Sequence, residues 1–272
     1  GKPIYVRREI VHNPHVVSDL RNKGAIFVEE LDEVPTGQRV IFSAHGVSPE
    51  VWKQSRERGL IVMDATCPLV TKVHLEALKY AKEGYSILLV GHRGHDEVIG
   101  TMGEAPETII LVEDIERARA VQVLNPDKVV ALTQTTLSVN DTSEIMRVLK
   151  ERFVNLVSRN DICYATTNRQ AAVKAISREV DLVMVIGAQN SSNCNRLREV
   201  AEAEGVPAYL INGPADVQDS WLEGVERVGI TSGASTPERL VEEVVAKLRP
   251  TTVSNVEIVE EDVTFLLPKA LR

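Results

Sequence analysis

One stretch of the sequence occurs twice, and this internal repeat restricts the fold more than any other feature. The first copy is Asp64–Lys72 (DATCPLVTK) and the second is Asp161–Gln170 (DICYATTNRQ). In both copies a cysteine follows an aspartate and precedes a helical pattern. An apolar run then ends in glycine 24 residues after each cysteine, at Gly91 and at Gly187. The equal spacing from cysteine to glycine in both copies predicts a repeated small α/β domain.

Two earlier runs, Ile4–Asn13 and Val40–Ser48, resemble the apolar runs that follow the cysteine in the two copies. They could therefore belong to a further copy of the repeat. The front of that copy is not in the sequence, which starts at Gly1. The repeat spacing places its cysteine about 24 residues before Arg7, upstream of Gly1. We therefore expect an N-terminal truncation.

Apolar strands alternate with helical patterns along the chain, which predicts mainly parallel sheets with helices on both faces. We expect three similar α/β lobes in a pseudo-threefold trefoil around a central cavity. Thr166 or Thr167 is expected to cap the helix after Cys163. The tail Val253–Leu267 alternates and is expected to form a strand that returns to the first lobe. The expected boundaries are 1–66 for the first lobe, 67–160 for the second, 161–249 for the third and 250–272 for the tail.

The composition argues against several classes of protein. A net charge of −8 over 272 residues argues against nucleic-acid binding, which needs clustered Lys and Arg. No apolar run approaches the ~20 residues of a membrane span. The cysteine count is three, an odd number, and no secretory signal is visible. This indicates a reducing, cytoplasmic setting, in which a recurring cysteine is more often a metal or redox residue than half of a disulfide.

Polar residues follow the predicted strands at the edge where open α/β sheets bind their ligands. Hydroxyl, amide and imidazole groups beside helix starts suit an anion such as phosphate. No glycine-rich nucleotide-binding loop is present, so a nucleotide is not the obvious anion. The polar segments are His12–Asn13, Ser43–His45, His92–Glu97, Thr133–Thr136, Ser191–Asn193 and Ser232–Ser235.

Each of these residues also has a plain structural interpretation. A serine or threonine at a strand end is often a helix cap, and a single cysteine is often a packing residue. Cys194 has no counterpart in the repeat, and we expect it to be such a packing residue. Cysteines from three lobes would instead suit an iron–sulfur cluster with one open iron. Two alternatives remain: a zinc-dependent hydrolase that uses His92, His95 and a cysteine, and a non-catalytic diphosphate-binding module.

Several of the sequence stretches are long and unusual: Glu9–Asn13, Ser43–Ser48, Asp64–His74, Gly91–His95, Thr133–Ser138, Asp161–Gln170, Asn190–Asn193 and Gly233–Ser235. Through them the chain resembles, over its whole length, the 4-hydroxy-3-methylbut-2-enyl diphosphate reductases of the LytB/IspH family. The resemblance implies a two-electron, two-proton reductive dehydroxylation. Its products would be isopentenyl and dimethylallyl diphosphate, in the last step of the non-mevalonate isoprenoid pathway.

The resemblance also implies roles for single residues. Cys67 and Cys163 would be two of three ligands to a [4Fe–4S] cluster whose fourth iron takes the substrate hydroxyl. Glu97 would deliver protons, and Thr135 would bind the substrate near its hydroxyl. Electrons would come from ferredoxin or flavodoxin. The first ligand cysteine of the family, in a Gly-Phe-Cys-Ala-Gly setting, is absent from this sequence, and Cys194 occupies a place in the diphosphate-binding loop. The implied diphosphate-binding residues are His12, His45, His95, Ser191, Ser192, Asn193 and Ser235.

Overall fold

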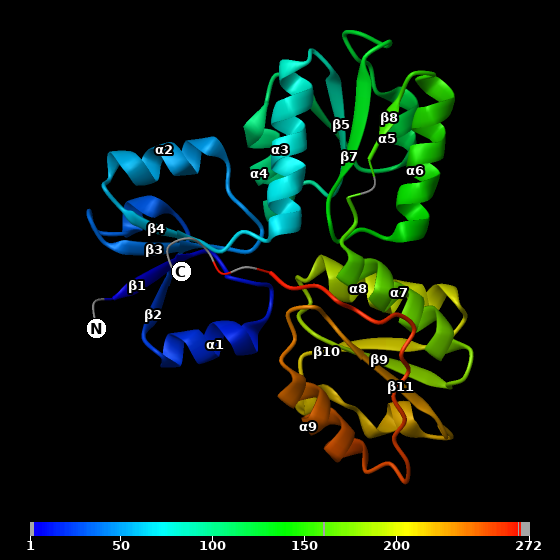
Figure 1. Ribbon diagram of the computed structural model, residues 1–272. Coiled ribbons are helices and arrows are strands. Elements are labelled where there is room, and N and C mark those ends of the chain that lie inside the picture. The colour runs from blue at the N-terminus through cyan, green and yellow to red at the C-terminus, as the bar shows by residue number, and fades with distance from the viewer. Residues whose placement is uncertain (1–2, 160, 266, 268–272) are drawn as a thin grey trace. The chain divides into compact units, whose positions relative to one another are not determined.

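The computed structural model describes residues 3–159, 161–265 and 267. Within these residues the strands form three separate parallel sheets (Figure 1). The chain divides into two compact units. The first is built mainly from Asp19–Ile162 and holds two of the sheets, and the second is built mainly from Cys163–Val263 and holds one. The short segment His12–Ser18 belongs to the second unit.

The three sheets of the described chain share one strand order. The earliest strand of each sheet lies inside it, with the next strand on one side and the third on the other. In the first two sheets a fourth strand continues beyond the third. This shared order confirms the predicted repeat of α/β lobes. The strands are β1 (Ile4–Arg7), β2 (Ala25–Val28), β3 (Arg39–Phe42), β4 (Ile61–Asp64), β5 (Ser86–Val90), β6 (Ile109–Val112), β7 (Val129–Thr133), β8 (Val157–Ser158), β9 (Leu182–Ile186), β10 (Ala208–Ile211) and β11 (Val228–Ser232).

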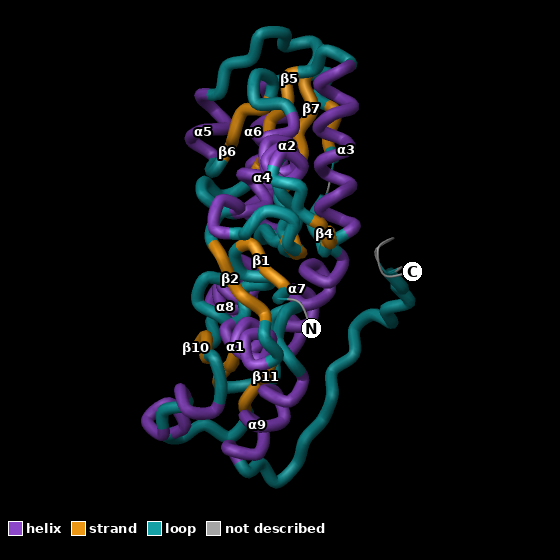
Figure 2. The backbone as a smooth tube through the Cα atoms, turned by 90° about the vertical axis from the view of Figure 1, so that its left-hand side faces the viewer, coloured by secondary structure: helices purple, strands orange, loops and turns teal. Residues whose placement is uncertain are grey.

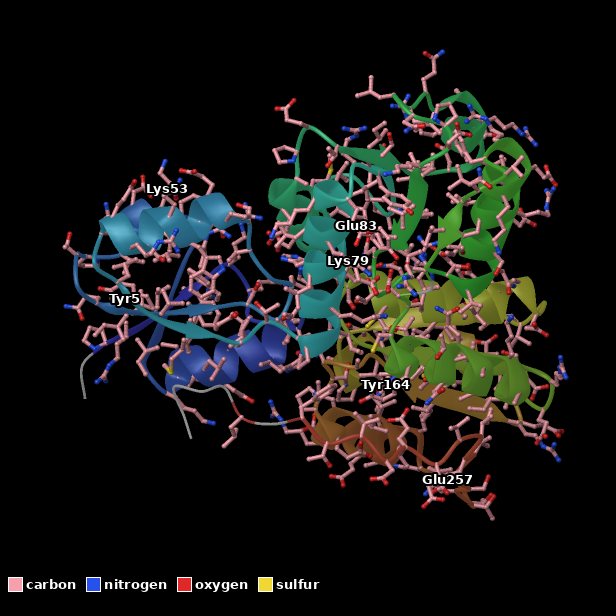
Figure 3. The ribbon with its side chains drawn as sticks, turned by 45° about the horizontal axis from the view of Figure 1, so that its top comes forward. Tyr5, Lys53, Lys79, Glu83, Tyr164 and Glu257 are labelled. Carbon is pink, nitrogen blue, oxygen red and sulfur yellow. The ribbon has the colours of Figure 1, made fainter. Side chains whose placement is uncertain are left out.

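In the first sheet, α2 (Pro49–Glu57) packs against the apolar side chains of β3. The ring of Trp52 on α2 meets the ring of Phe42 edge-on, with centroids 4.9 Å apart. Lys53 lies on the outer face of α2, where it pairs with Glu50 and Glu57 (Figure 3). This division into an apolar and a charged face explains why the segment forms a helix on the sheet. The lobe also contains a short 3-10 turn, η1 (Leu31–Glu33), and α1 (Pro14–Asn22) connects β1 to β2.

The second sheet has helices on both faces. Val73 and Tyr80 of α3 and Val98 of α4 belong to one apolar cluster, and residues of α5 and α6 belong to the other. Every residue of β5 and β7 is buried. Burying one aliphatic side chain stabilises a fold by roughly 1.5–3 kcal/mol, so this double core fixes the ends of both strands firmly. The helices are α3 (Pro68–Lys82), α4 (Asp96–Glu104), α5 (Ile115–Ala120) and α6 (Val139–Arg152).

The third sheet is built in the same way. Residues of α7 and α8 pack on one face of β9, and residues of α9 pack on the other. The stacked rings of Tyr209 and Trp221, 3.9 Å apart, extend the cluster beside α9. The helices are α7 (Tyr164–Ser177), α8 (Ser192–Ala203) and α9 (Glu238–Leu248), with the 3-10 turns η2 (Pro214–Asp216) and η3 (Asp219–Leu222).

The predicted threonine cap of α7 is wrong. The N-cap residue is Cys163, whose carbonyl accepts hydrogen bonds from the N–H groups of Thr166 and Thr167, both at 2.9 Å. Thr166 is therefore inside the first turn, and Thr167 donates its hydroxyl to the Tyr164 carbonyl at 2.9 Å. The extended backbone of Cys163 lets its carbonyl begin the helix without a capping side chain.

The predicted strand in the tail is also wrong for the described residues. Residues 251–265 and 267 include no strand, as the loop colouring in Figure 2 shows, and all of them are exposed. Val263 and Phe265 are each 48% exposed, so their alternation buries no apolar face. Without a sheet edge to pair with, an alternating pattern alone does not make a strand. The trefoil arrangement and the lobe boundaries stay predictions.

Candidate active site

The residues that follow β5 and β7 lie together because these parallel strands are direct neighbours. The backbone N–H of His92 donates to Oε1 of Gln134 at 3.1 Å, which joins the two connections. A Cβ atom on Gly91 would lie 2.7 Å from Cγ2 of Val98. Glycine at this position therefore lets α4 come close to the end of β5.

Glu97 is a buried carboxyl in the first turn of α4, with 5% of its surface exposed. Thr135 donates its backbone N–H to Oε2 of Glu97 at 2.9 Å and its hydroxyl to the same oxygen at 2.8 Å. Burial raises the pKa of Glu97, and the hydrogen bonds from Thr135 act in the opposite direction with smaller effect. Both donors bind Oε2, so Oε1 is the oxygen that can carry a proton. The pair Glu97–Thr135 can thus hold a proton near an acceptor.

Two histidines lie beside this pair in the same unit. His95 is the N-cap of α4, and its Nδ1 accepts the backbone N–H of Glu97 at 3.2 Å. This bond leaves Nε2 as the proton-bearing nitrogen of a neutral ring. The ring of His45 meets the ring of His95 edge-on, with centroids 5.9 Å apart. The two imidazoles are donors of the kind that bind an anion.

The sequence pattern indicated no role for Asp96, although both of its neighbours, His95 and Glu97, were predicted site residues. Its carboxylate forms an ion pair with Arg8, and Oδ2 lies 4.0 Å from Nδ1 of His45. Asp96 thus connects β1, the loop after β3 and α4. Two features of the sequence could have indicated this contact. Asp96 lies between His95 and Glu97, and Arg8 directly precedes the Glu9–Asn13 stretch.

Cys67 and Cys163 have the same local structure. Each is a half-buried cysteine, and each is the N-cap of a helix, α3 or α7, with similar backbone angles. The N–H of Cys67 donates to the Ala44 carbonyl at 3.0 Å, so the cysteine is tied to the loop that carries His45. Free N–H groups at a helix start favour a negative charge, such as that of a metal-bound thiolate.

The aspartate that precedes each cysteine fixes the segment leading to it. Asp64 accepts the backbone N–H of Thr66 at 3.0 Å and so closes the turn before Cys67. Asp161 binds Lys72 Nζ at 3.0 Å, and its backbone N–H donates to the hydroxyl of Thr133 at 3.2 Å. In both copies of the repeat, the aspartate therefore fixes the segment that leads to the cysteine.

The second unit presents serine and asparagine at the start of α8. Ser191 is the N-cap, and its hydroxyl accepts the backbone N–H of Cys194 at 3.4 Å; Ser192 is the first helical residue. Asn193 is 5% exposed, and its Oδ1 and Nδ2 are buried without a hydrogen-bond partner among the described residues. An unsatisfied buried amide costs about 1–3 kcal/mol, which a bound polar ligand would offset. This helix start is thus suited to an anion.

Ser235 and His12 come together in the same unit. The hydroxyl of Ser235, in the turn after β11, donates to the backbone carbonyl of His12 at 3.3 Å. The predicted site residues thus fall into both units: His45, His95, Glu97 and Thr135 in the first, and His12, Ser191, Ser192, Asn193 and Ser235 in the second.

Cys194 is a core residue, as predicted. It is fully buried in the cluster beneath α8, and burial raises the pKa of its thiol. Cβ atoms built on Gly187 and Gly233 would lie 2.2 and 2.3 Å from its Sγ. The sulfur therefore fills the space that these glycines leave.

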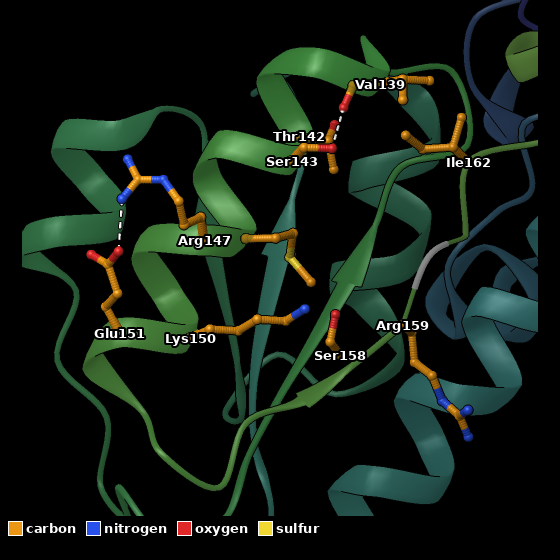
Figure 4. A pocket seen from close by; sticks show the side chains of 10 residues that line it. Val139, Thr142, Ser143, Arg147, Lys150, Glu151, Ser158, Arg159 and Ile162 are labelled. Atoms are coloured by element: carbon orange, nitrogen blue, oxygen red, sulfur yellow. Dashed lines mark hydrogen bonds and ion pairs between the residues drawn. The ribbon is translucent and has the colours of Figure 1, made fainter.

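A pocket of about 510 Å³ lies between α6 and the segment around β8 (Figure 4). Met146 and Ile162 supply apolar atoms, and Arg147, Lys150 and Arg159 supply positive charge. Its lining includes none of the predicted site residues. As for membrane segments, within the described chain no helix is both long enough and apolar enough to cross a bilayer.

Comparison with known proteins identifies the family. The model of the LytB protein family matches residues 1–249. The 4-hydroxy-3-methylbut-2-enyl diphosphate reductase of Azoarcus sp. (strain BH72) is 54% identical over 277 residues, covering 100% of this chain and 89% of the relative. The enzyme of the same name from Pseudomonas entomophila (strain L48) is 54% identical over 281 residues, with the same coverage.

Solved structures agree with these relatives. The structure of the E-1-hydroxy-2-methyl-but-2-enyl-4-diphosphate reductase from Plasmodium falciparum superposes with a TM-score of 0.96 at 40% identity, covering 99% of this chain and 87% of the other. A structure of (E)-4-hydroxy-3-methyl-but-2-enyl diphosphate reductase, described as the terminal enzyme of the non-mevalonate pathway, gives 0.65 at 36% identity, with 90% and 88% coverage. The chain therefore belongs to the LytB family and is a reductase of the 4-hydroxy-3-methylbut-2-enyl diphosphate reductase class.

Proposed function

We propose that this reductase uses Glu97 as its proton donor, a [4Fe–4S] cluster as its redox group, and ferredoxin or flavodoxin as its electron source. The reaction would take an allylic alcohol diphosphate, two electrons and two protons. The C–O bond breaks, a C–H bond forms, and the hydroxyl leaves as water, giving isopentenyl or dimethylallyl diphosphate. The observation that carries the proposal is the buried Glu97 carboxyl, held through one oxygen by Thr135.

Cys67 and Cys163 would be two of the cysteine ligands of the cluster. The donor set fits such a group, because both are half-buried cysteines at helix starts, whereas Cys194 is enclosed in the core. Thiolates are the usual ligands of iron–sulfur clusters. When bound, the cluster supplies electrons and a Lewis-acidic iron for the substrate hydroxyl.

The diphosphate would be bound by hydroxyl, amide and imidazole donors. Binding of this remote, non-reacting group provides the energy that orients the allylic end. Asn193 can supply its unused amide N–H groups, and His95 can supply Nε2–H. The residues proposed for this task are His12, His45, His95, Ser191, Ser192, Asn193 and Ser235.

Glu97 would keep its proton until the hydroxyl leaves. Burial raises its pKa, so the carboxylic acid persists at a pH where an exposed glutamate is ionised. Thr135 fixes the carboxyl plane through Oε2, and its hydroxyl group would bind the substrate hydroxyl. Protonating the leaving oxygen is a task for which such an acid is typically worth 10²–10⁴-fold in rate.

The proposal is tested by anaerobic reconstitution of the protein, expressed from its complete gene, with iron and sulfide. We expect iron and acid-labile sulfide in a four-to-four ratio, a broad visible absorption, and turnover of the allylic diphosphate with reduced ferredoxin or flavodoxin. Colourless protein that holds zinc would instead support the zinc-hydrolase alternative. Binding of the diphosphate without any metal or turnover would support the non-catalytic module.

Asn193→Ala is expected to weaken diphosphate binding by about tenfold or more, because hydrogen bonds to charged groups are worth about 1.5–3 kcal/mol each. The melting temperature should stay the same or rise, because the free protein loses buried polar atoms that have no partner. Calorimetric titration with inorganic diphosphate measures the affinity. Asn125→Ala, at an exposed turn between α5 and β7, is the control for affinity and should leave it at the parent value. Parent-like affinity in the Asn193 variant would contradict the role.

A further inference from the structure

His74 is a buried histidine of α3 to which the proposed reaction gives no task. Its Nδ1 lies 2.8 Å from Oε1 of Glu104, the last residue of α4, and each side chain is 10% exposed. The other ring nitrogen, Nε2, is buried and has no hydrogen-bond partner among the described residues. Burying such a pair is costly, so it needs a compensating role in structure or function.

The His74 ring fits between two glycines. A Cβ atom on Gly46 would lie 3.2 Å from Cε1 and 3.3 Å from Nε2, and a Cβ atom on Gly100 would lie at the same two distances. One turn later on α4, a Cβ atom on Gly103 would lie 2.4 Å from the Cβ of Ser48. Both helical glycines therefore let α4 approach the loop Gly46–Ser48 closely, with the imidazole at the contact.

The elements on either side of this ring carry the proposed reaction groups. Gly46 directly follows His45, whose ring lies 5.9 Å from that of His95. Gly100 is one helical turn after Glu97 on α4, and His95 caps the same helix. A shift of the loop against α4 would therefore separate His45 from His95 and Glu97.

We propose that His74 is a positioning residue of the reductase: held by Glu104, its imidazole fixes the loop that carries His45 against the helix that carries His95 and Glu97. The inference rests on the proposed role of Glu97. A displacement of about 1 Å at a reacting group can cost up to 10²-fold in rate, so an indirect contact can have a large effect.

The first test compares His74→Leu with His74→Asn in the reconstituted enzyme. Asparagine places an amide near the Nδ1 position and can keep the hydrogen bond to Glu104, whereas leucine cannot. We expect His74→Leu to lower kcat by about 10- to 100-fold with a smaller change in KM. His74→Asn should recover at least part of this loss. His15→Asn is the control, since His15 is a half-buried histidine bound to the Asn212 carbonyl at 2.9 Å, and should keep the parent kcat.

The second test is Gly100→Ala, which separates positioning from stability. Alanine stabilises a helix interior by roughly 0.8–1 kcal/mol relative to glycine, so α4 itself should not be weakened. Its methyl group would press on the His74 ring, at 3.2 Å from Cε1 and 3.3 Å from Nε2. We expect kcat to fall severalfold while the melting temperature is kept.

Parent-like kcat in both His74→Leu and Gly100→Ala would overturn the proposal, and if the leucine variant does not fold, Gly100→Ala decides. Hydrogen exchange of the unloaded chain gives a readout that does not depend on the reaction. His74→Leu should speed exchange in residues 43–48 and 95–104, and unchanged exchange in both segments would contradict the positioning role. If the parent protein fails to reduce the diphosphate substrate, the proposed function fails, while this exchange result still decides the role of His74.

Discussion

Glu97→Gln is expected to lower kcat by about 10²- to 10⁴-fold and to leave KM close to that of the parent enzyme. Glutamine keeps the size of the side chain, and its carbonyl oxygen can still accept the N–H and hydroxyl of Thr135. It cannot donate a proton to the leaving hydroxyl. Since the diphosphate supplies most of the binding energy, the loss should appear in turnover.

The same substitution should raise stability in neutral and alkaline solution. Burial holds the pKa of Glu97 above the ordinary value of 4.5. In this range the folded protein binds more protons than the unfolded chain, so its stability falls as the pH rises from 4.5 through the folded pKa. Glutamine has no such loss. We expect equal melting temperatures near pH 4 and a higher one for the variant in alkaline solution, with each pKa unit worth about 1.4 kcal/mol.

Glu83→Gln provides the matched control for both measurements. Glu83 is exposed at the end of α3 (Figure 3), and its substitution should change neither kcat nor the pH dependence of melting. Near-normal turnover in Glu97→Gln would exclude proton donation by this residue. Lost turnover with the parent pH dependence of melting would show that Glu97 is not buried as a neutral acid.

The sequence was sufficient to predict the repeat because the repeat is local. The spacing between each cysteine and the glycine after the next strand reports one α/β unit, and the shared strand order confirms it. The helix α4 was missed, although it carries Glu97. Gly100 and Gly103 lower its intrinsic helix propensity, and their role in close packing against Gly46–Ser48 depends on tertiary contacts. The acidic first turn of Asp96 and Glu97 was the available signal for its start.

The contacts within the candidate site depend on residues that are distant in sequence. Glu97 meets Thr135 only because β5 and β7 pair in one register, and Asp96 meets Arg8 only because β1 lies near α4. A residue list can indicate that such side chains are polar and follow strands. It cannot assign partners, and it cannot show that Asn193 leaves both amide atoms without partners among the described residues. In the tail, by contrast, the alternating pattern predicted a strand that does not form. No strand of the described chain lies beside the tail to pair with it.

The second large effect is expected for the cysteines. Cys67→Ser and Cys163→Ser should each lose most of the bound iron after anaerobic reconstitution, and turnover with it. A serine hydroxyl is a harder and far less acidic ligand than a thiol, so it is a poor substitute at an iron–sulfur cluster. Iron and sulfide analysis measures the loss. Each variant should keep its fold, because each cysteine is half-buried and caps its helix through backbone groups.

Cys194→Ser separates ligand loss from a general effect of removing a thiol. Cys194 packs against Gly187 and Gly233 inside the core, and burial raises its pKa, so it stays a neutral thiol. We expect its serine variant to keep the iron and sulfide content of the parent, with a lower melting temperature because the smaller side chain leaves space in a tight core. If this variant loses iron while Cys67→Ser or Cys163→Ser retains it, the assignment of the repeated cysteines as ligands is wrong. Parent-like iron in all three variants would place the ligands on other residues, because three independent thiol losses would then leave the metal site intact.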